Sequence, residues 1–374
     1  MTPWLLIATA LGHGGPPRTH SLMWDASGNT IVSSSHGLIF EDDGYSWVCD
    51  EVLGTVAPSE VIQSNDNLLM RSTQGVAFST DGCQWTWAEG SEGLVIWDIA
   101  TDTVDPGTVW IATEDGLWRS TDAGESFTFS DTPNPSASIR SFVQMPDMSW
   151  TILGFLDGLP MAWRGTADDW QTIDLPARGG HLIALGTDDE GHAYARMPEA
   201  SGADTLIGVA PDGDVSTLLD LDKRIDAFIS LDGAILISVQ DTGLQLSSDH
   251  GVTWESRGIE PTRCLIVHDE QLFGCPDDSA RRMWSYTSLD LSTETTQWLP
   301  GPAFDRVSGQ RCDASLSCDM VWPQVQRELG LVEDLDTGDT GHPTPDADDV
   351  RCGCSQGAAV VLVPWSLLWV RRRA

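Results

Sequence analysis

A short motif that recurs along the chain constrains the fold more than any other feature of the sequence. In each copy an Asp is followed one or two positions later by Gly, and an aromatic residue stands three positions after that Gly: FEDDGYSW, FSTDGCQW, RSTDAGESF and LSSDHGVTW. The four aspartates are Asp43, Asp81, Asp122 and Asp249. Asp accepts hydrogen bonds from backbone N–H groups within turns, and Gly tolerates a positive φ angle. The motif therefore predicts a tight turn between two antiparallel strands.

The spacing of this motif predicts how many times the unit repeats. Successive aspartates lie 38, 41 and 127 residues apart, and the last interval is close to three repeats. Weaker copies fill it at Asp168 and Asp212, and another follows at Asp290. Each unit also divides into four short apolar strands. We therefore predict an all-β fold, a seven-bladed β-propeller of four-stranded antiparallel blades. A pair of β-sandwiches is the alternative, because it also uses many short strands.

The motif resembles the Asp-box, or BNR repeat, of sialidases and related propellers. That resemblance implies a turn-stabilising role for the boxes, and it requires that sialidase activity be tested. Sialidases are similar in using an arginine cluster, a Tyr–Glu nucleophile pair and an Asp acid/base, and their first arginine usually stands in an Arg-Ile-Pro motif. This sequence has no such motif, and its only tyrosines are Tyr45, Tyr194 and Tyr286. We expect no sialidase, and we assign no catalytic, cofactor-binding or metal-binding residue.

Composition shifts divide the chain into five predicted parts. Residues 1–14 hold the apolar run WLLIATAL followed by small residues, which predicts a signal peptide. The propeller is expected over residues 19–300, with a closing or cap segment over 301–330. Residues 331–351 are rich in Asp, Thr, Gly and Pro, which predicts an acidic, extended linker. Residues 352–374 form a sorting or membrane segment, discussed next.

The C-terminal end combines Cys352-Gly-Cys354, a short apolar run and three terminal arginines. The apolar run, residues 357–370, is shorter than the roughly 20 residues that a membrane-spanning helix needs. This end resembles the myxobacterial sorting tail called MYXO-CTERM. The resemblance implies that the tail is removed and that Cys352 or Cys354 becomes a lipid-anchored end at the surface of a Gram-negative cell. A simple tail anchor or a poorly ordered tail is the alternative.

The other six cysteines predict disulfides, because an even number suits an oxidising compartment. Local pairing is expected for Cys264 with Cys275 and for Cys312 with Cys318. Cys49 and Cys83 lie near the turns of neighbouring units, so geometry could join them. A zinc site is the alternative, but no paired Cys or His spacing supports one.

Charge and aromatic content narrow the expected function. Acidic residues outnumber Lys and Arg 56 to 20, for a formal net charge of −36, which argues against a nucleic-acid partner. The histidines are interpreted as strand-end or turn residues: His36, His181, His192, His250 and His268. Most tryptophans occupy repeat or strand positions, and Trp150 and Trp284 are the best candidates for exposed sugar-stacking residues.

We predict a monomeric, surface-anchored module that binds an unknown protein or glycan ligand without a cofactor and contacts the membrane through its C-terminal tail. A secreted glycoside hydrolase, or another polysaccharide-active enzyme on the same scaffold, is one alternative. An envelope assembly or maturation factor is another.

Overall fold

The computed structural model describes residues 19–310, apart from gaps at 26, 35–36, 42–43, 50–59, 73, 167–168, 177–180, 232, 277–286, 291–294 and 299–306, together with Cys312 and Cys318. The chain divides into two units, Met1–Glu333 and Asp334–Ala374, and every described residue belongs to the first. The predicted signal peptide, acidic linker and sorting segment lie outside the described residues. Within the described part, no helix has the length and apolar character needed to cross a membrane.

Six of the sheets are four-stranded antiparallel meanders in which consecutive strands pair. Their strands are β5 (Glu60–Ser64), β6 (Asn67–Ser72), β7 (Gly75–Ser79) and β8 (Thr86–Trp87); β9 (Ile96–Thr101), β10 (Val109–Thr113), β11 (Gly116–Ser120) and β12 (Thr128–Asp131); β13 (Ala137–Gln144), β14 (Trp150–Leu156), β15 (Leu159–Thr166) and β16 (Asp169–Asp174); β17 (Ile183–Thr187), β18 (Ala193–Pro198), β19 (Asp204–Val209) and β20 (Val215–Asp220); β21 (Ile225–Leu231), β22 (Ala234–Val239), β23 (Gly243–Ser247) and β24 (Glu255–Ser256); β25 (Thr262–His268), β26 (Gln271–Pro276), β27 (Thr287–Asp290) and β28 (Thr295–Trp298).

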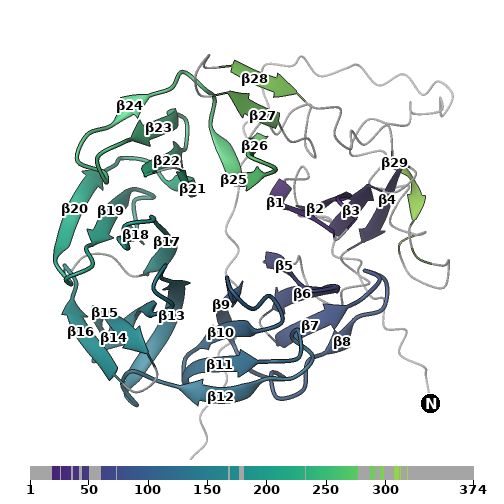
Figure 1. Ribbon diagram of the computed structural model, residues 1–374, viewed down its shortest axis with the longest axis horizontal. Helices are drawn as coiled ribbons and strands as arrows, with labels where there is room; N and C mark the ends of the chain where they lie inside the picture. The colour runs from purple at the N-terminus through teal and green to yellow at the C-terminus, as the bar shows by residue number, and fades with distance from the viewer. Residues whose placement is uncertain are drawn as a thin grey trace, which may run out of the picture. The chain divides into compact units, whose positions relative to one another are not determined.

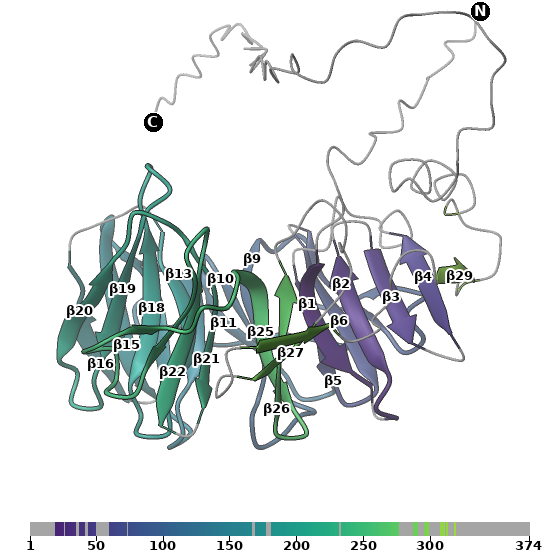
Figure 2. The same cartoon turned by 90° about the horizontal axis from the view of Figure 1, so that it is seen from above.

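The remaining sheet begins the described chain and has a different composition. It contains β1 (Thr19–Trp24), β2 (Thr30–Ser34), β3 (Gly37–Glu41), β4 (Tyr45–Cys49) and β29 (Val307–Gln310). Strand β29 comes from the C-terminal side of the repeats and pairs in parallel with β4, beside which it lies in Figure 2. The prediction of seven four-stranded antiparallel blades is therefore wrong, because six sheets have that form and this sheet is five-stranded and mixed. The repeat pattern missed β29 because that strand belongs to no repeat.

The sheets are arranged in a ring around a common centre (Figure 1). The first strand of each sheet contacts the first strand of the next sheet, and β25 contacts β1, which closes the ring. The second and third strands carry most of the buried positions, whereas outer strands such as β12 and β20 are largely exposed. The apolar core is divided between sheet interfaces. In one such cluster, Leu38 and Phe40 of the first sheet pack with Met70 and Ala77 of the next.

The glycines of the repeated turns allow neighbouring sheets to approach each other. Gly82, Gly124 and Gly251 all have positive φ angles, of 75°, 86° and 90°. A Cβ atom on Gly82 would lie 2.4 Å from the Phe40 ring of the preceding sheet. The corresponding atoms on Gly124 and Gly251 would lie 2.4 Å from Leu69 and 2.7 Å from Leu218. The turn motif therefore also determines how closely one sheet packs on the next.

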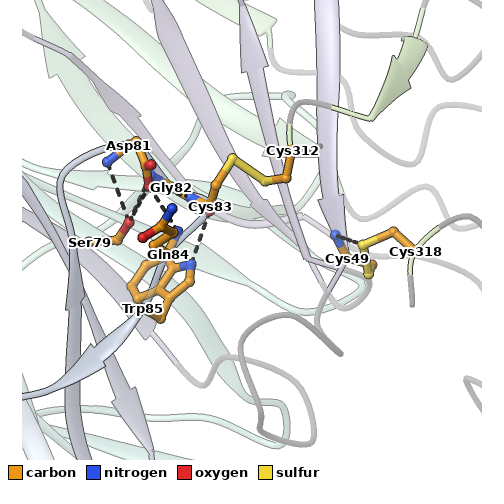
Figure 3. Close-up of a disulfide and its surroundings, with 9 residues drawn as sticks. All are labelled: Cys49, Ser79, Asp81, Gly82, Cys83, Gln84, Trp85, Cys312 and Cys318. Atoms are coloured by element: carbon orange, nitrogen blue, oxygen red, sulfur yellow. Dashed lines mark hydrogen bonds between the residues drawn. A yellow bond between two sulfur atoms is a disulfide. The ribbon is translucent and has the colours of Figure 1, made fainter. Parts of the chain in front are cut away.

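The six cysteines predicted to form disulfides do form three. Cys264 and Cys275 face each other across β25 and β26 and are bonded, as predicted from their spacing. The other two predicted pairings are wrong, because the structure joins Cys49 to Cys318 and Cys83 to Cys312 (Figure 3). Their Cα atoms lie 5.6 and 5.5 Å apart, within the usual range for a disulfide.

The closure of the ring explains why the pairing of four cysteines could not be predicted from their distance along the chain. Strand β29 returns to the first sheet, and it brings the C-terminal segment against the strands that carry Cys49 and the turn that carries Cys83. These bonds therefore join the C-terminal segment to the first two sheets. Three disulfides indicate an exported protein, since such bonds persist in oxidising compartments.

Candidate functional site

A pocket of about 630 Å³ lies where the inner strands of the ring meet. Its walls come from β1, β5, β6, β9, β13, β17, β18 and β21, so most of the sheets contribute to it. Three arginines and three acidic residues line it: Arg71, Arg140, Arg196, Glu60, Asp98 and Asp226. Positive and negative side chains are thus interleaved in one enclosure of a strongly acidic protein. We call this enclosure the central pocket.

One wall of the central pocket is built by a charged pair on β5 and β6. Arg71 Nε lies 3.2 Å from Glu60 Oε2, and the Arg71 guanidinium also donates to the carbonyl oxygen of Trp97. On the adjacent β9, Asp98 Oδ2 accepts a hydrogen bond from the Ser141 hydroxyl at 2.6 Å and another from the Phe142 N–H at 3.1 Å. Asp98 therefore connects β9 to β13.

Two carboxyl groups in this wall bind protons more readily than usual. Desolvation raises the pKa of Glu60 to about 7, against the opposing charge of Arg71 and with a further contribution from Asp98. The Glu60 side chain keeps 35% of its surface exposed, so this group is still reachable from the pocket. Burial also raises the pKa of Asp98, although its bonds from Ser141 and Phe142 oppose the shift. The pocket can thus present a protonated carboxyl near neutral pH.

Arg140 and Trp97 form a stacked pair that also lines the central pocket. The Arg140 guanidinium carbon lies 3.9 Å from the ring centre of Trp97, and Arg140 Nη2 lies 3.2 Å from Glu114 Oε1. Arg140 Nε and Nη1, together with Trp97 Nε1, have no hydrogen-bond partner among the described residues. Asp226 accepts a bond from Arg224 Nε at 2.7 Å through Oδ1, whereas its Oδ2 has no partner there. A buried polar atom that lacks a hydrogen-bond partner lowers the stability of the fold by about 1–3 kcal/mol.

The repeat aspartates that the structure describes are not among the residues that line the central pocket. Asp81, Asp122 and Asp249 lie in the turns between the third and fourth strands of their sheets. Asp212 occupies the same place between β19 and β20, and Asp290 ends β27. Asp43 and Asp168 lie outside the described residues. The repeat therefore marks turns between the third and fourth strands within a sheet, and the chemistry of the ring centre comes from residues outside the motif.

Hydrogen bonds within the turns explain the residue types of the motif. Asp81 Oδ1 accepts from the N–H groups of Cys83 and Gln84 at 2.7 and 2.9 Å, as Figure 3 shows. Partial burial alone would raise the pKa of Asp81, but these N–H donors and the Ser79 hydroxyl hold it below its usual value. Trp85 Nε1 donates to the Gly82 carbonyl at 3.0 Å. Trp254 and Gly251 make the same contact in another sheet, at 2.9 Å.

The structure tests one of the two tryptophans that were expected to be exposed and to stack on a sugar. Trp150 is only 6% exposed and packs against Trp110 and Phe142, so its expected exposure is wrong. Trp284 lies outside the described residues. None of the tryptophans whose burial the structure describes is among the exposed large apolar side chains.

The pocket residues were missed because no motif marks them. Each charged residue stands on a different short strand; Glu60 and Arg71 pair across one hairpin, but the others come together only because the sheets pack around the ring. A weak signal was present in charged residues within otherwise apolar strands: Asp98 in IWDIA and Arg140 in ASIRSFV. A charged residue in an apolar strand either pairs with a partner inside the protein or faces a polar pocket. Asp98 and Arg140 do both.

Comparison with known proteins identifies the architecture. The sequence matches no protein-family model and no curated protein sequence. Among solved structures, a virginiamycin B lyase from Staphylococcus aureus is similar with a TM-score of 0.53 at 10% identity, over 70% of this chain and 92% of that chain. The computationally designed protein Ika8 gives 0.51 at 12% identity, over 78% of this chain and 89% of that chain. The fold is a β-propeller.

A third similar structure shows the same propeller as part of a larger protein. The extracellular domain of a one-component system from B. thetaiotaomicron gives a TM-score of 0.52 at 13% identity, over 71% of this chain but only 39% of that chain. Identities this low show the fold alone. A propeller presents variable loops and a central enclosure on a rigid ring, which supports a role as a binding or interaction module.

Proposed function

We propose that this chain is an exported propeller, held at the cell surface, that binds a peptide segment of a partner protein in its central pocket. The observation that carries the proposal is the interleaving of three arginines and three acidic residues around about 630 Å³ at the ring centre. Ligand pockets typically enclose about 300–1,000 Å³ and use a few polar groups to fix orientation. A peptide carries carboxylates, amines and amides that match both signs of charge.

The pocket chemistry favours a peptide over a neutral glycan. Sugar rings bind to open aromatic faces, but Arg140 covers one face of Trp97 at 3.9 Å. Among the described residues that line the pocket, the atoms without a hydrogen-bond partner include donors on Arg140 and Trp97 and an acceptor on Asp226. A backbone amide, with one acceptor and one donor, supplies a partner of each kind.

Binding is tested with peptides selected from a random display library against the full exported protein. We expect titration calorimetry to show that Arg140→Gln and Asp226→Asn each weaken the selected peptides at least tenfold. Lys223→Gln is the control, because Lys223 pairs with Asp241 on the exposed surface and is not among the residues that line the pocket. Peptides whose affinity does not respond to either pocket variant would overturn the peptide assignment.

Surface anchoring rests on the two chain ends and the three disulfides. We infer that Cys352 or Cys354 receives the lipid. We also assign the repeated turns to the Asp-box class, because of the hydrogen bonds that their aspartates accept. Replacing both tail cysteines with serine should release the protein from intact cells into the medium and abolish labelling by a radioactive fatty acid. A double variant that stays on the cells and retains the label would refute this anchoring.

A second function is favoured by one observation, the pKa of about 7 at Glu60. A carboxyl with that pKa can act as a general acid near neutral pH, and Asp98 is close enough to influence its charge. The alternative is therefore a polysaccharide-active enzyme at the same pocket. Release of reducing ends from a panel of soluble polysaccharides, abolished by Glu60→Gln and unaffected by Lys223→Gln, would establish it. No turnover by the wild-type protein on that panel would count against it.

A further inference from the structure

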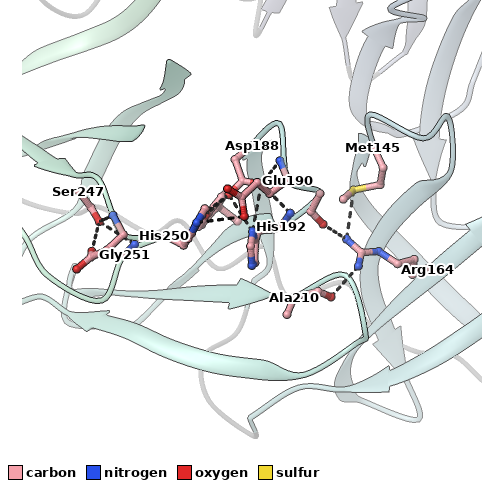
Figure 4. A network of polar contacts seen from close by, with 12 residues as sticks. Met145, Arg164, Asp188, Glu190, His192, Ala210, Ser247, His250 and Gly251 are labelled. Atoms are coloured by element: carbon pink, nitrogen blue, oxygen red, sulfur yellow. Dashed lines mark hydrogen bonds and ion pairs between the residues drawn. The ribbon is translucent and has the colours of Figure 1, made fainter. Parts of the chain in front are cut away.

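A second cluster of ionisable residues lies between two neighbouring sheets, apart from the central pocket. Asp188 and His192 belong to the turn between β17 and β18, and His250 belongs to the turn between β23 and β24 of the next sheet. Figure 4 shows the two imidazoles converging on the Asp188 carboxylate. The sequence interpretation treated both histidines as isolated turn residues, because 58 positions separate them.

The cluster has the geometry of a ligand set. Asp188 Oδ2 lies 3.0 Å from His192 Nδ1 and 2.9 Å from His250 Nδ1. One ligand atom from each residue can be chosen so that all lie within 4.8 Å of one another. The Asp188 side chain is fully buried, whereas the imidazoles keep 23% and 30% of their surfaces exposed. The carboxylate is thus held inside the protein, and the imidazoles form the side open to solvent.

The turn itself requires only part of the Asp188 carboxylate. Oδ1 accepts the N–H groups of Glu190 and His192 at 3.1 and 2.9 Å, which is the role that Asp25 Oδ1 plays in the first sheet toward Ser27 and Asn29. Oδ2 is left to receive both imidazoles and the Tyr194 hydroxyl, the latter at 2.7 Å. Turn stabilisation therefore does not account for the convergence on Oδ2.

The groups around Asp188 fix the position of its carboxylate: the Tyr194 hydroxyl donates to Oδ2, and the backbone N–H groups of Glu190 and His192 donate to Oδ1. Glu190 adds a second carboxylate, with its Oε2 3.4 Å from His250 Nε2 and a largely exposed side chain. The cluster therefore offers two imidazoles, one fixed carboxylate and one adjustable carboxylate.

We propose that Asp188, His192 and His250 bind one divalent transition-metal ion, for which zinc is the probe. Two imidazole nitrogens and a carboxylate oxygen form a ligand set that zinc accepts at about 2.0–2.2 Å. Tetrahedral coordination at that length separates ligand atoms by roughly 3.3 Å, so the present contacts would open by only a few tenths of an ångström. The metal replaces the proton on each Nδ1: a neutral imidazole then carries its proton on Nε2, and an imidazolium releases one proton to water. Water completes the coordination, and Glu190 Oε2, 3.4 Å from His250 Nε2, accepts the remaining N–H of that imidazole. Tyr194 acts as a positioning residue, because its hydroxyl orients the ligating carboxylate.

Metal binding is tested on full-length protein without an affinity tag, after removal of metals with a chelator. Titration calorimetry with zinc chloride should show one site per chain. His250→Ala should weaken zinc binding at least about 100-fold, and Tyr194→Phe about tenfold. His268→Ala is the matched control, because that imidazole stacks on Trp24, 4.2 Å between ring centres, outside the cluster.

The chain itself shows that the key variant can fold. Ala123 occupies the position of His250 in the equivalent turn, with φ of 58° against 57°. Cobalt provides a second measurement, since coordination by nitrogen and oxygen in a tetrahedral site produces intense visible absorption that His250→Ala should remove. Absence of saturable binding to wild-type protein would overturn the proposal, as would binding that His250→Ala leaves unchanged while circular dichroism shows a native fold.

Discussion

Replacing Cys83 and Cys312 with serine removes one of the two disulfides that join the C-terminal segment to the first sheets. While Cys49–Cys318 remains, the lost bond closes a loop of only about 40 residues, made of positions 49 to 83 and 312 to 318. Chain entropy then assigns it about 4 kcal/mol, and the same reasoning gives about 4 kcal/mol for losing Cys49–Cys318 alone. Removing both loses that closure and then the remaining long one, which spans 229 or 269 residues and is assigned about 5.5 kcal/mol, so the double loss costs about 9.5 kcal/mol.

The two disulfides are therefore expected to be cooperative, with the combined loss exceeding the sum of the single losses by about 1.5 kcal/mol. Urea unfolding followed by tryptophan fluorescence measures each free energy, and peptide mapping by mass spectrometry without reduction checks the pairing. The variant lacking Cys264–Cys275 is the control, because that bond closes a separation of 11 residues and should cost about 3 kcal/mol. Detection of a Cys49–Cys83 or Cys312–Cys318 peptide in the native protein would refute the reasoning.

Three further predictions concern the turns and the central pocket. Gly82→Ala should cost about 1–3 kcal/mol more than Gly93→Ala, because both residues have φ near 80° but only the first meets Phe40; equal losses in urea unfolding would contradict the packing argument. Asp81→Ala should lower stability by about 1–2 kcal/mol, because two backbone N–H groups lose a charged acceptor. Asp212→Ala should cost less, since Asp212 accepts one bond, from Asp214. Because the pKa of Glu60 rises from 4.5 to about 7 on folding, the stability of wild type relative to Glu60→Gln should be greatest below pH 4.5 and fall as pH rises through 7. A difference that does not change over that range, in thermal unfolding at fixed ionic strength, would show that Glu60 is not shifted.

The strands and turns follow from local sequence, and for that reason they were predictable. An Asp that accepts N–H bonds two or three residues away, as Asp81 does, acts within a few residues of chain. The same holds for Cys264 and Cys275, which lie opposite each other in one hairpin. The regular spacing of such turns was enough to predict an all-β propeller, and the even number of cysteines was enough to predict disulfides in an exported protein.

The first sheet and two of the disulfides depended on ring closure, and both candidate sites depended on how neighbouring sheets pack. Strand β29 pairs with β4 only because the last sheet returns the chain to the first. Cys312 and Cys318 then find partners more than 200 residues away, and no local pattern records that distance. Likewise, Glu60 meets Asp98, and Asp188 meets His250, only across neighbouring sheets. The sequence alone determined what each hairpin does, whereas the tertiary structure decided which distant side chains share an enclosure, because closing a ring creates contacts between segments that have no relation along the chain.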